Sequence, residues 1–245
     1  MQTLIKISDD QGILADELAA EISELVNKSA SRKKPFFMAL SGGTTPELLF
    51  GILGRKFGRS TDWSHTHIFW ADERCVPPGD KESNYGMTRR NLLDLISIPE
   101  SNIHRINGEA PPEEEAKSYS SEISNLVPAL NGWPAFDLVL LGLGNDGHTA
   151  SIFAGDKRLL RSEHICCVAT HPVSGQKRIT ITGKVINNAF RVFFLVTGLS
   201  KADVVAEVIE CPGEVDYPAA SIEPEHGLLK WYLDNDAASM LNQWA

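Results

Sequence analysis

The sequence lacks long apolar runs and any excess of positive charge. No stretch approaches the length that a membrane-spanning helix needs, and the N-terminus has no basic region followed by an apolar core and a small-residue cleavage site. The formal net charge is -9, whereas binding to nucleic acid or to an anionic membrane needs a broad positive surface. We therefore expect a cytoplasmic protein with no nucleic-acid or membrane partner, in which basic residues act locally on one small anionic ligand.

Cysteine is scarce, and two common catalytic motifs are absent. The four cysteines show neither CxxC spacing nor the density of a small disulfide framework, so we expect reduced thiols. The sequence contains no GxxxxGK[ST] and no GxSxG. These absences disfavour a P-loop nucleotide hydrolase and a serine hydrolase with a nucleophile elbow.

What the sequence does contain is an alternation of strand-like and helix-like segments. Short apolar or alternating runs predict strands at 3–7, 36–40, 65–70, 139–141, 165–169, 178–182, 192–196 and 231–233, the last as an edge strand before a closing helix that reaches Ala245. The segments between several of them have helical spacing. The alternation predicts an α/β fold with a mostly parallel sheet flanked by helices, and the absence of linkers and repeats favours a single domain over residues 1–245.

The segment 136–148, FDLVLLGLGNDGH, ends a buried strand in a glycine loop. We expect its three glycines to adopt conformations that a side chain would forbid, and to deliver Asp146 and His148 to the carboxyl end of the strand, where open α/β sheets bind ligands. The glycines also match GxGxxG. However, a dinucleotide site needs an acidic residue at the end of the next strand, and that strand ends in Ala-Thr-His. We therefore interpret His148 as a general base.

A second glycine turn, SGGTTPELL, follows the strand at 36–40. Thr44 or Thr45 is expected to cap the next helix, with Glu47 completing a capping box. Free N–H groups and hydroxyls at such a helix start can hold a phosphate. An ordinary strand-to-helix turn explains the same residues equally well.

Charged residues follow other strand ends. Asp72, Glu73 and Arg74 come after the strand at 65–70, and Arg178 and Lys201 lie near the ends of two later strands. They are candidate carboxylates and cations for the same site.

Two nearby segments, the histidine pair at 65 and 67 and residues 149–153, are expected to have no catalytic role. His65 and His67 are two residues apart and would share one strand face, but no third metal ligand is evident, so we expect solvent-facing histidines. The residues at 149–153 are expected to continue from the glycine loop as a helix.

Several segments, taken in order, resemble the 6-phosphogluconolactonase family. They are SGGTTPELL, WADERCVP followed by SNYGM, LLGLGNDGHTASIF, RITIT with INNA, and VTGLSKA, and the resemblance as a whole covers roughly residues 41–231. The resemblance implies the modified Rossmann-like sheet shared with glucosamine-6-phosphate deaminase and ribose-5-phosphate isomerase. It implies hydrolysis of 6-phospho-D-glucono-1,5-lactone to 6-phosphogluconate, the second step of the oxidative pentose phosphate pathway, with no metal or organic cofactor.

The resemblance also implies roles for individual residues. His148 would be the general base, and we group Asp146 with it as catalytic, although Asp146 could do no more than shape the loop. The remaining candidates would bind substrate: Arg74 and Lys201 at the phosphate, Ser41, Gly42, Gly43 and Thr44 as N–H and hydroxyl donors, Arg178 as a further cation, and Asp72 at sugar hydroxyls or beside Arg74. The only partner expected is a small sugar-phosphate lactone, bound by a monomer or weak homodimer.

Two alternatives stay open. A related amino-sugar-phosphate deaminase or isomerase would be expected to have a glutamate five residues after the histidine, where this chain has Phe153, and an aromatic residue in place of Arg74. A non-catalytic sugar-phosphate sensor could use the same pocket but would not need His148. Phe153 and Arg74 disfavour the deaminase, and the presence of His148 disfavours the sensor, so the lactonase is favoured.

Overall fold

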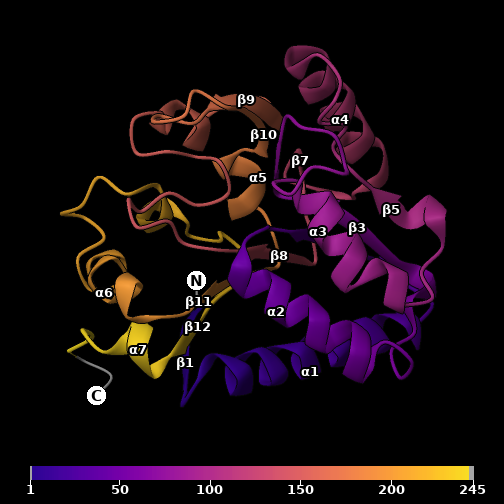
Figure 1. Ribbon diagram of the computed structural model, residues 1–245. Helices are drawn as coiled ribbons and strands as arrows, with labels where there is room; N and C mark the ends of the chain where they lie inside the picture. The colour runs from indigo at the N-terminus through magenta and orange to yellow at the C-terminus, as the bar shows by residue number, and fades with distance from the viewer. Residues whose placement is uncertain (1, 243–245) are drawn as a thin grey trace.

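The structure, a computed structural model, describes residues 2–242 and is built around a parallel sheet (Figure 1). Its strands lie in the order β1-β12-β11-β8-β2-β3-β5, and every neighbouring pair is parallel. They are β1 (Gln2–Ser8), β2 (Phe36–Leu40), β3 (Thr66–Trp70), β5 (Ile103–His104), β8 (Leu138–Leu141), β11 (Arg191–Val196) and β12 (Leu228–Asp234). All residues of β2 and β8 are buried, as expected for apolar runs inside a sheet covered on both faces.

Helices lie on both faces of this sheet, with α1 and α2 on one side and α4 and α5 on the other (Figure 1). The helices are α1 (Gln11–Ala30), α2 (Thr44–Ile52), α3 (Asn84–Asn91), α4 (Pro112–Leu126), α5 (Gly183–Asn187), α6 (Ala202–Glu210) and α7 (Asn235–Ala238). Asp10 caps α1, because its Oδ1 accepts from the N–H groups of Gly12 and Ile13 at 2.7 and 2.8 Å. None of the helices within the described residues is long and apolar enough to cross a membrane.

A second, antiparallel sheet has the order β4-β10-β9. It consists of β4 (Asp72–Arg74), β10 (Lys177–Ile181) and β9 (Cys166–Thr170), and a short hairpin pairs β6 (Ala129–Leu130) with β7 (Trp133–Pro134). The charged triplet after β3 is therefore a strand that pairs with β10. Its register sets Asp72 opposite Thr180 and Arg74 opposite Arg178.

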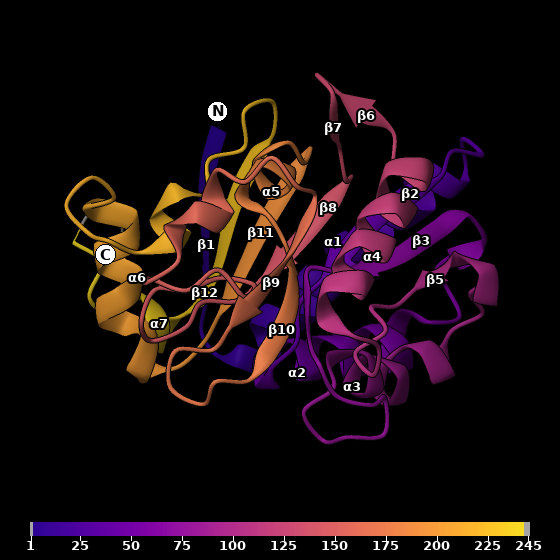
Figure 2. The same cartoon turned by 90° about the horizontal axis from the view of Figure 1, so that it is seen from above.

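Two predicted elements differ from the structure near the C-terminus of the chain. The strand predicted at the edge is β12, which pairs with both β1 and β11 and so lies inside the sheet; Figure 2 shows it beside β1. The closing helix α7 ends at Ala238, and residues 243–245 lie outside the described residues.

No helix forms at 149–153. Thr149 and Ile152 instead form an isolated bridge, and Ala150 has a positive φ of 48°. Contacts from distant segments explain this conformation, because the Ser151 N–H donates to Thr180 Oγ1 at 3.2 Å and its hydroxyl donates to Asp72 Oδ2 at 2.6 Å.

The two histidines expected on one strand face are separated. His65 belongs to a 3-10 turn before β3. His67 is half-buried, and its Nδ1 lies 3.0 Å from His104 Nε2. His104 in turn bonds to Glu122 at 2.7 Å. The expectation of two solvent-facing strand histidines is therefore wrong, because the neighbouring strand β5 supplies a ring partner for His67.

Candidate active site

A pocket opens where β2, β8 and β11 end, and it brings together most of the residues singled out from the sequence. The predicted residues that line it are Ser41, Gly42, Gly43, Thr44, Asp72, Arg74, His148, Arg178 and Lys201. The remaining one, Asp146, does not line the pocket but forms a hydrogen bond with His148. The carboxyl ends of parallel strands are where open α/β sheets bind ligands, so the location agrees with the sequence-based expectation.

His148 and Asp146 form a hydrogen-bonded dyad, with 2.5 Å between His148 Nδ1 and Asp146 Oδ1. Partial burial acts to raise the pKa of the Asp146 carboxyl, but the hydrogen bond and charge of His148 outweigh it, and the net shift is downward. Asp146 is therefore a carboxylate, which can only accept, so the proton of a neutral imidazole lies on Nδ1. This leaves His148 Nε2 with a free lone pair, the form required of a general base.

Two of the three loop glycines are required by the backbone or by close packing. Gly147 has a φ of +74° and packs against the ring of Tyr217, and a Cβ on Gly144 would meet the His148 ring. Gly142 has neither constraint, because open space surrounds its Cβ position and its φ is not positive. The expectation that all three glycines adopt conformations that a side chain would forbid is therefore confirmed only for Gly147, because Gly144 is required by packing and Gly142 by neither.

The helix α2 begins without a side-chain cap. Gly43 is its N-cap residue, with a φ of +110°, so neither threonine caps the helix and no capping box forms. Glu47 instead accepts a hydrogen bond from Asn91 at 3.2 Å, and Thr45 Oγ1 lies 2.9 Å from Thr197 Oγ1. The uncapped start of α2 thus borders the pocket, where its N–H groups and partial positive charge suit an anion.

Arg74 and Arg178 are opposed across the β4–β10 pair. Within residues 2–242 neither guanidinium forms an ion pair, and the Nε atoms of both are buried without a hydrogen-bond partner, as is Ser41 Oγ. Burial lowers the pKa of Arg178, an effect that Asp72 partly opposes and Arg74 reinforces. Like charges facing each other across strands are destabilising, so this arrangement favours a negatively charged or strongly accepting ligand between them.

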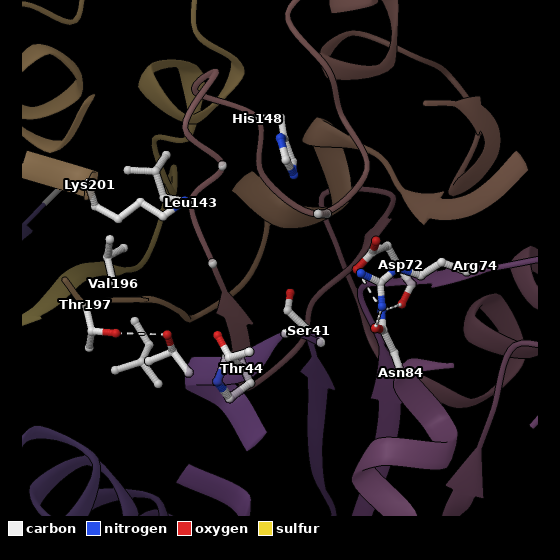
Figure 3. A pocket seen from close by; sticks show the side chains of 18 of the residues that line it. Ser41, Thr44, Asp72, Arg74, Asn84, Leu143, His148, Val196, Thr197 and Lys201 are labelled. Carbon is white, nitrogen blue, oxygen red and sulfur yellow. Dashed lines mark hydrogen bonds between the residues drawn. The ribbon is translucent and has the colours of Figure 1, made fainter. Parts of the chain in front are cut away.

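Lys201 and Arg74 line the pocket from opposite sides. Figure 3 shows Lys201 and Thr197 on one side, Asp72 and Arg74 on the other, and His148 above the space between them. Burial lowers the pKa of Lys201, and the charge of Asp146 partly offsets this effect. The pocket therefore has two cationic walls.

The pocket is also lined by three residues that were not predicted from the sequence, Asn84, Thr45 and Thr197. Asn84 occurs in SNYGM, a segment quoted only for its resemblance, and its side-chain Nδ2 donates to the carbonyl oxygen of Asp72 at 2.8 Å. The sequence signal for Asn84 is its polar side chain directly after Ser83, the residue that caps α3.

Glu73, a candidate carboxylate on sequence grounds, does not line the pocket. Its side chain is buried and accepts from the N–H groups of Asn84 and Tyr85, each at 2.7 Å. Burial raises the pKa of its carboxyl, and these hydrogen bonds oppose the rise. Glu73 therefore holds the start of α3 against β4.

Comparison with known proteins gives one consistent family. The family model of glucosamine-6-phosphate isomerases/6-phosphogluconolactonase matches residues 9–231. A 6-phosphogluconolactonase of Haemophilus influenzae is 45% identical over 84% of this chain and 88% of its own, and one of Synechocystis is 36% identical over 98% and 99%. The solved 6-phosphogluconolactonase of Trypanosoma brucei superimposes with a TM-score of 0.88 at 27% identity, covering 98% of this chain and 99% of the other. The chain belongs to the glucosamine-6-phosphate isomerase/6-phosphogluconolactonase family.

Proposed function

We propose that this protein is an enzyme that hydrolyses 6-phospho-D-glucono-1,5-lactone to 6-phosphogluconate, the second step of the oxidative pentose phosphate pathway. The observation that carries the proposal is the His148–Asp146 dyad beside a pocket with cations on two walls. Relatives at 36–45% identity that bear the name 6-phosphogluconolactonase support it.

The dyad provides the base for attack by water. His148 Nε2 removes a proton from a water molecule as its oxygen bonds to the lactone carbonyl carbon, and the carbonyl becomes a tetrahedral oxyanion. The oxyanion then collapses, the bond to the ring oxygen breaks, and the imidazolium returns the proton to that oxygen. Asp146 stabilises the imidazolium formed in between and fixes its orientation.

The substrate phosphate fits the wall formed by Lys201 and the start of α2. An uncapped helix start, the hydroxyl of Thr44 and a half-buried ammonium all favour a dianion there. On the opposite wall the buried carboxylate of Asp72 would repel a phosphate, but it can accept hydrogen bonds from sugar hydroxyls. The resemblance assigned both Arg74 and Lys201 to the phosphate. We instead propose that Lys201 binds the phosphate and that Arg74 does not.

Arg74 and Arg178 then lie at the lactone end. Both guanidiniums line the pocket, and their positive charges are suited to an oxygen that gains negative charge in the transition state. This assignment supplies oxyanion donors that the sequence alone left unassigned.

Phosphorylated sugars are charged and do not cross membranes freely, which supports action in the cytoplasm. We propose a monomer or weak homodimer in which one chain supplies every residue used above.

Hydrolysis of freshly generated 6-phosphogluconolactone, followed by NMR against the spontaneous reaction, tests the activity. We expect a large acceleration, with unphosphorylated gluconolactone turned over much more slowly. Lys201→Ala should raise KM, and Arg74→Ala should mainly lower kcat. Equal rates on the two lactones would contradict the phosphate assignment.

A further inference from the structure

Asn84, the first residue of α3, joins two residues of one pocket wall. Its Nδ2 donates to the carbonyl oxygen of Asp72 at 2.8 Å and lies 3.4 Å from Asp72 Oδ1, while its Oδ1 accepts from Arg74 Nη1 (dashed in Figure 3). Asn84 is only 2% exposed, although it lines the pocket. A single amide therefore links the carboxylate and the guanidinium.

The guanidinium of Arg74 depends on this link. Within residues 2–242 its only other hydrogen bond goes from Nη1 to the carbonyl oxygen of Glu82 at 2.8 Å, and its Nε has no partner. Arg178 faces it across the sheet with the same charge. A long side chain held at one nitrogen and repelled from one side would populate other rotamers if Asn84 were removed.

Asn84 itself is firmly held. Its N–H donates to Glu73 Oε1 at 2.7 Å, and the preceding Ser83 hydroxyl donates to Glu73 Oε2 at 3.0 Å. Its amide also packs directly on the backbone of Gly42, where a Cβ would collide with it. The backbone and the amide plane of Asn84 are thus both fixed before any ligand binds.

We infer that Asn84 is a positioning residue, which holds Arg74 so that its remaining N–H groups face the lactone carbonyl. The inference rests on the proposed function, in which Arg74 stabilises the oxyanion. A neutral amide suits this position because it accepts from Arg74 and donates to Asp72 at the same time. A carboxylate there would accept from Arg74 but repel Asp72.

A double-mutant cycle between Asn84 and Arg74 tests the inference. Asn84→Ala should lower kcat/KM about 10- to 100-fold, through the same parameter that Arg74→Ala changes. In the Arg74→Ala background the same substitution should cost less than about threefold. Asn91→Ala is the matched control, because this α3 asparagine donates to Glu47 and to the carbonyl oxygen of Met87 outside the pocket; its activity should be unchanged.

A second variant covers the case in which Asn84→Ala does not fold. Asn84→Asp keeps the shape, and its carboxyl regains a donor only when protonated, so its activity relative to the wild type should rise as the pH falls. A ratio that is independent of pH would overturn the inference.

The outcomes separate the inference from the function on which it rests. Equal losses from Asn84→Ala in both backgrounds, or a harmless Asn84→Ala beside a damaging Arg74→Ala, would overturn the positioning role alone. Full activity of Arg74→Ala would instead refute the proposed oxyanion role of Arg74.

Discussion

Within residues 2–242 the imidazole of His148 has one hydrogen-bond partner, Asp146 at Nδ1, and its second nitrogen has none. Phe153 packs beside it with 5.1 Å between ring centroids, and Arg178 lies over the same phenyl ring at 5.6 Å. The position at which a deaminase would carry a glutamate is therefore filled by a buried ring that contacts both the proposed base and a proposed oxyanion donor. An additional carboxylate is neither present at this position nor needed for attack by water.

Replacing His148 should separate catalysis from binding. We expect His148→Ala to lower kcat by about 100- to 10,000-fold, because the general base is lost, and to leave the affinity for 6-phosphogluconate nearly unchanged. Asp146→Asn should also lower kcat, since an amide can donate to Nδ1 and so favour the wrong tautomer. Stopped assays combined with calorimetry of product binding measure both effects. A parallel loss of binding would make His148 a ligand-holding residue instead.

The affinity for the product should fall at alkaline pH because Lys201 loses its charge. Because burial lowers the pKa of Lys201, the ammonium loses its charge at a lower pH than an exposed lysine, and phosphate binding weakens as the pH rises through that range. Calorimetry with 6-phosphogluconate between about pH 7 and 10 measures this, since an unperturbed lysine titrates near 10.4. Lys201→Arg remains charged throughout, so the alkaline weakening should disappear. An identical alkaline loss in this variant would assign the effect to another group.

At the scale of secondary-structure elements, the loop after β8 is anchored to a segment far along the chain. Ala219 donates its N–H to the carbonyl oxygen of Gly147 at 3.0 Å, and the Tyr217 ring packs on the same glycine. The loop geometry that presents Asp146 and His148 therefore depends on residues about seventy positions later in the chain.

Gly147→Ala should damage both stability and turnover. The positive φ of Gly147 and the nearby Tyr217 ring make a side chain unfavourable, and we expect a loss of about 1–3 kcal/mol in the free energy of unfolding. kcat should fall as well, because the dyad flanks this residue. Gly155→Ala is the control, since its φ is not positive and its Cβ would meet nothing within 4 Å. Denaturant unfolding and the lactonase assay compare the two variants, and equal effects would argue against the loop constraint.

The sequence predicts those elements whose cause is local. The apolar runs of β2 and β8 carry their signals within a few residues, so their positions are confirmed. The segment at 149–153 has no such signal, because its hydrogen bonds come from Thr180 and Asp72.

The same distinction applies to the pocket. Ser41, His148 and Lys201 come together because they follow the carboxyl ends of β2, β8 and β11, which share one edge of the parallel sheet. The partnership of Asn84 with Arg74 depends on how Glu73 holds α3 against β4. The position of Arg74 opposite Arg178 depends on how β4 pairs with β10. That pairing has no counterpart in the local sequence pattern.

At the scale of the whole molecule, one sheet contains strands from both ends of the described chain. We propose a single domain and expect one cooperative unfolding transition, with circular dichroism and tryptophan fluorescence changing together. 6-Phosphogluconate should raise the midpoint of the entire transition, because binding stabilises only the folded state. Two separate transitions, of which only one responds to the product, would indicate two domains.

The place of β12 has a consequence for synthesis on the ribosome. Among the strands of residues 2–242, β1 lies at the edge of the sheet and pairs only with β12, which lies more than two hundred residues later in the chain. During translation β1 therefore cannot form this pairing until β12 has left the exit tunnel. The nascent chain can assemble β2, β3, β5, β8 and β11 earlier, whereas its first strand is among the last to be incorporated.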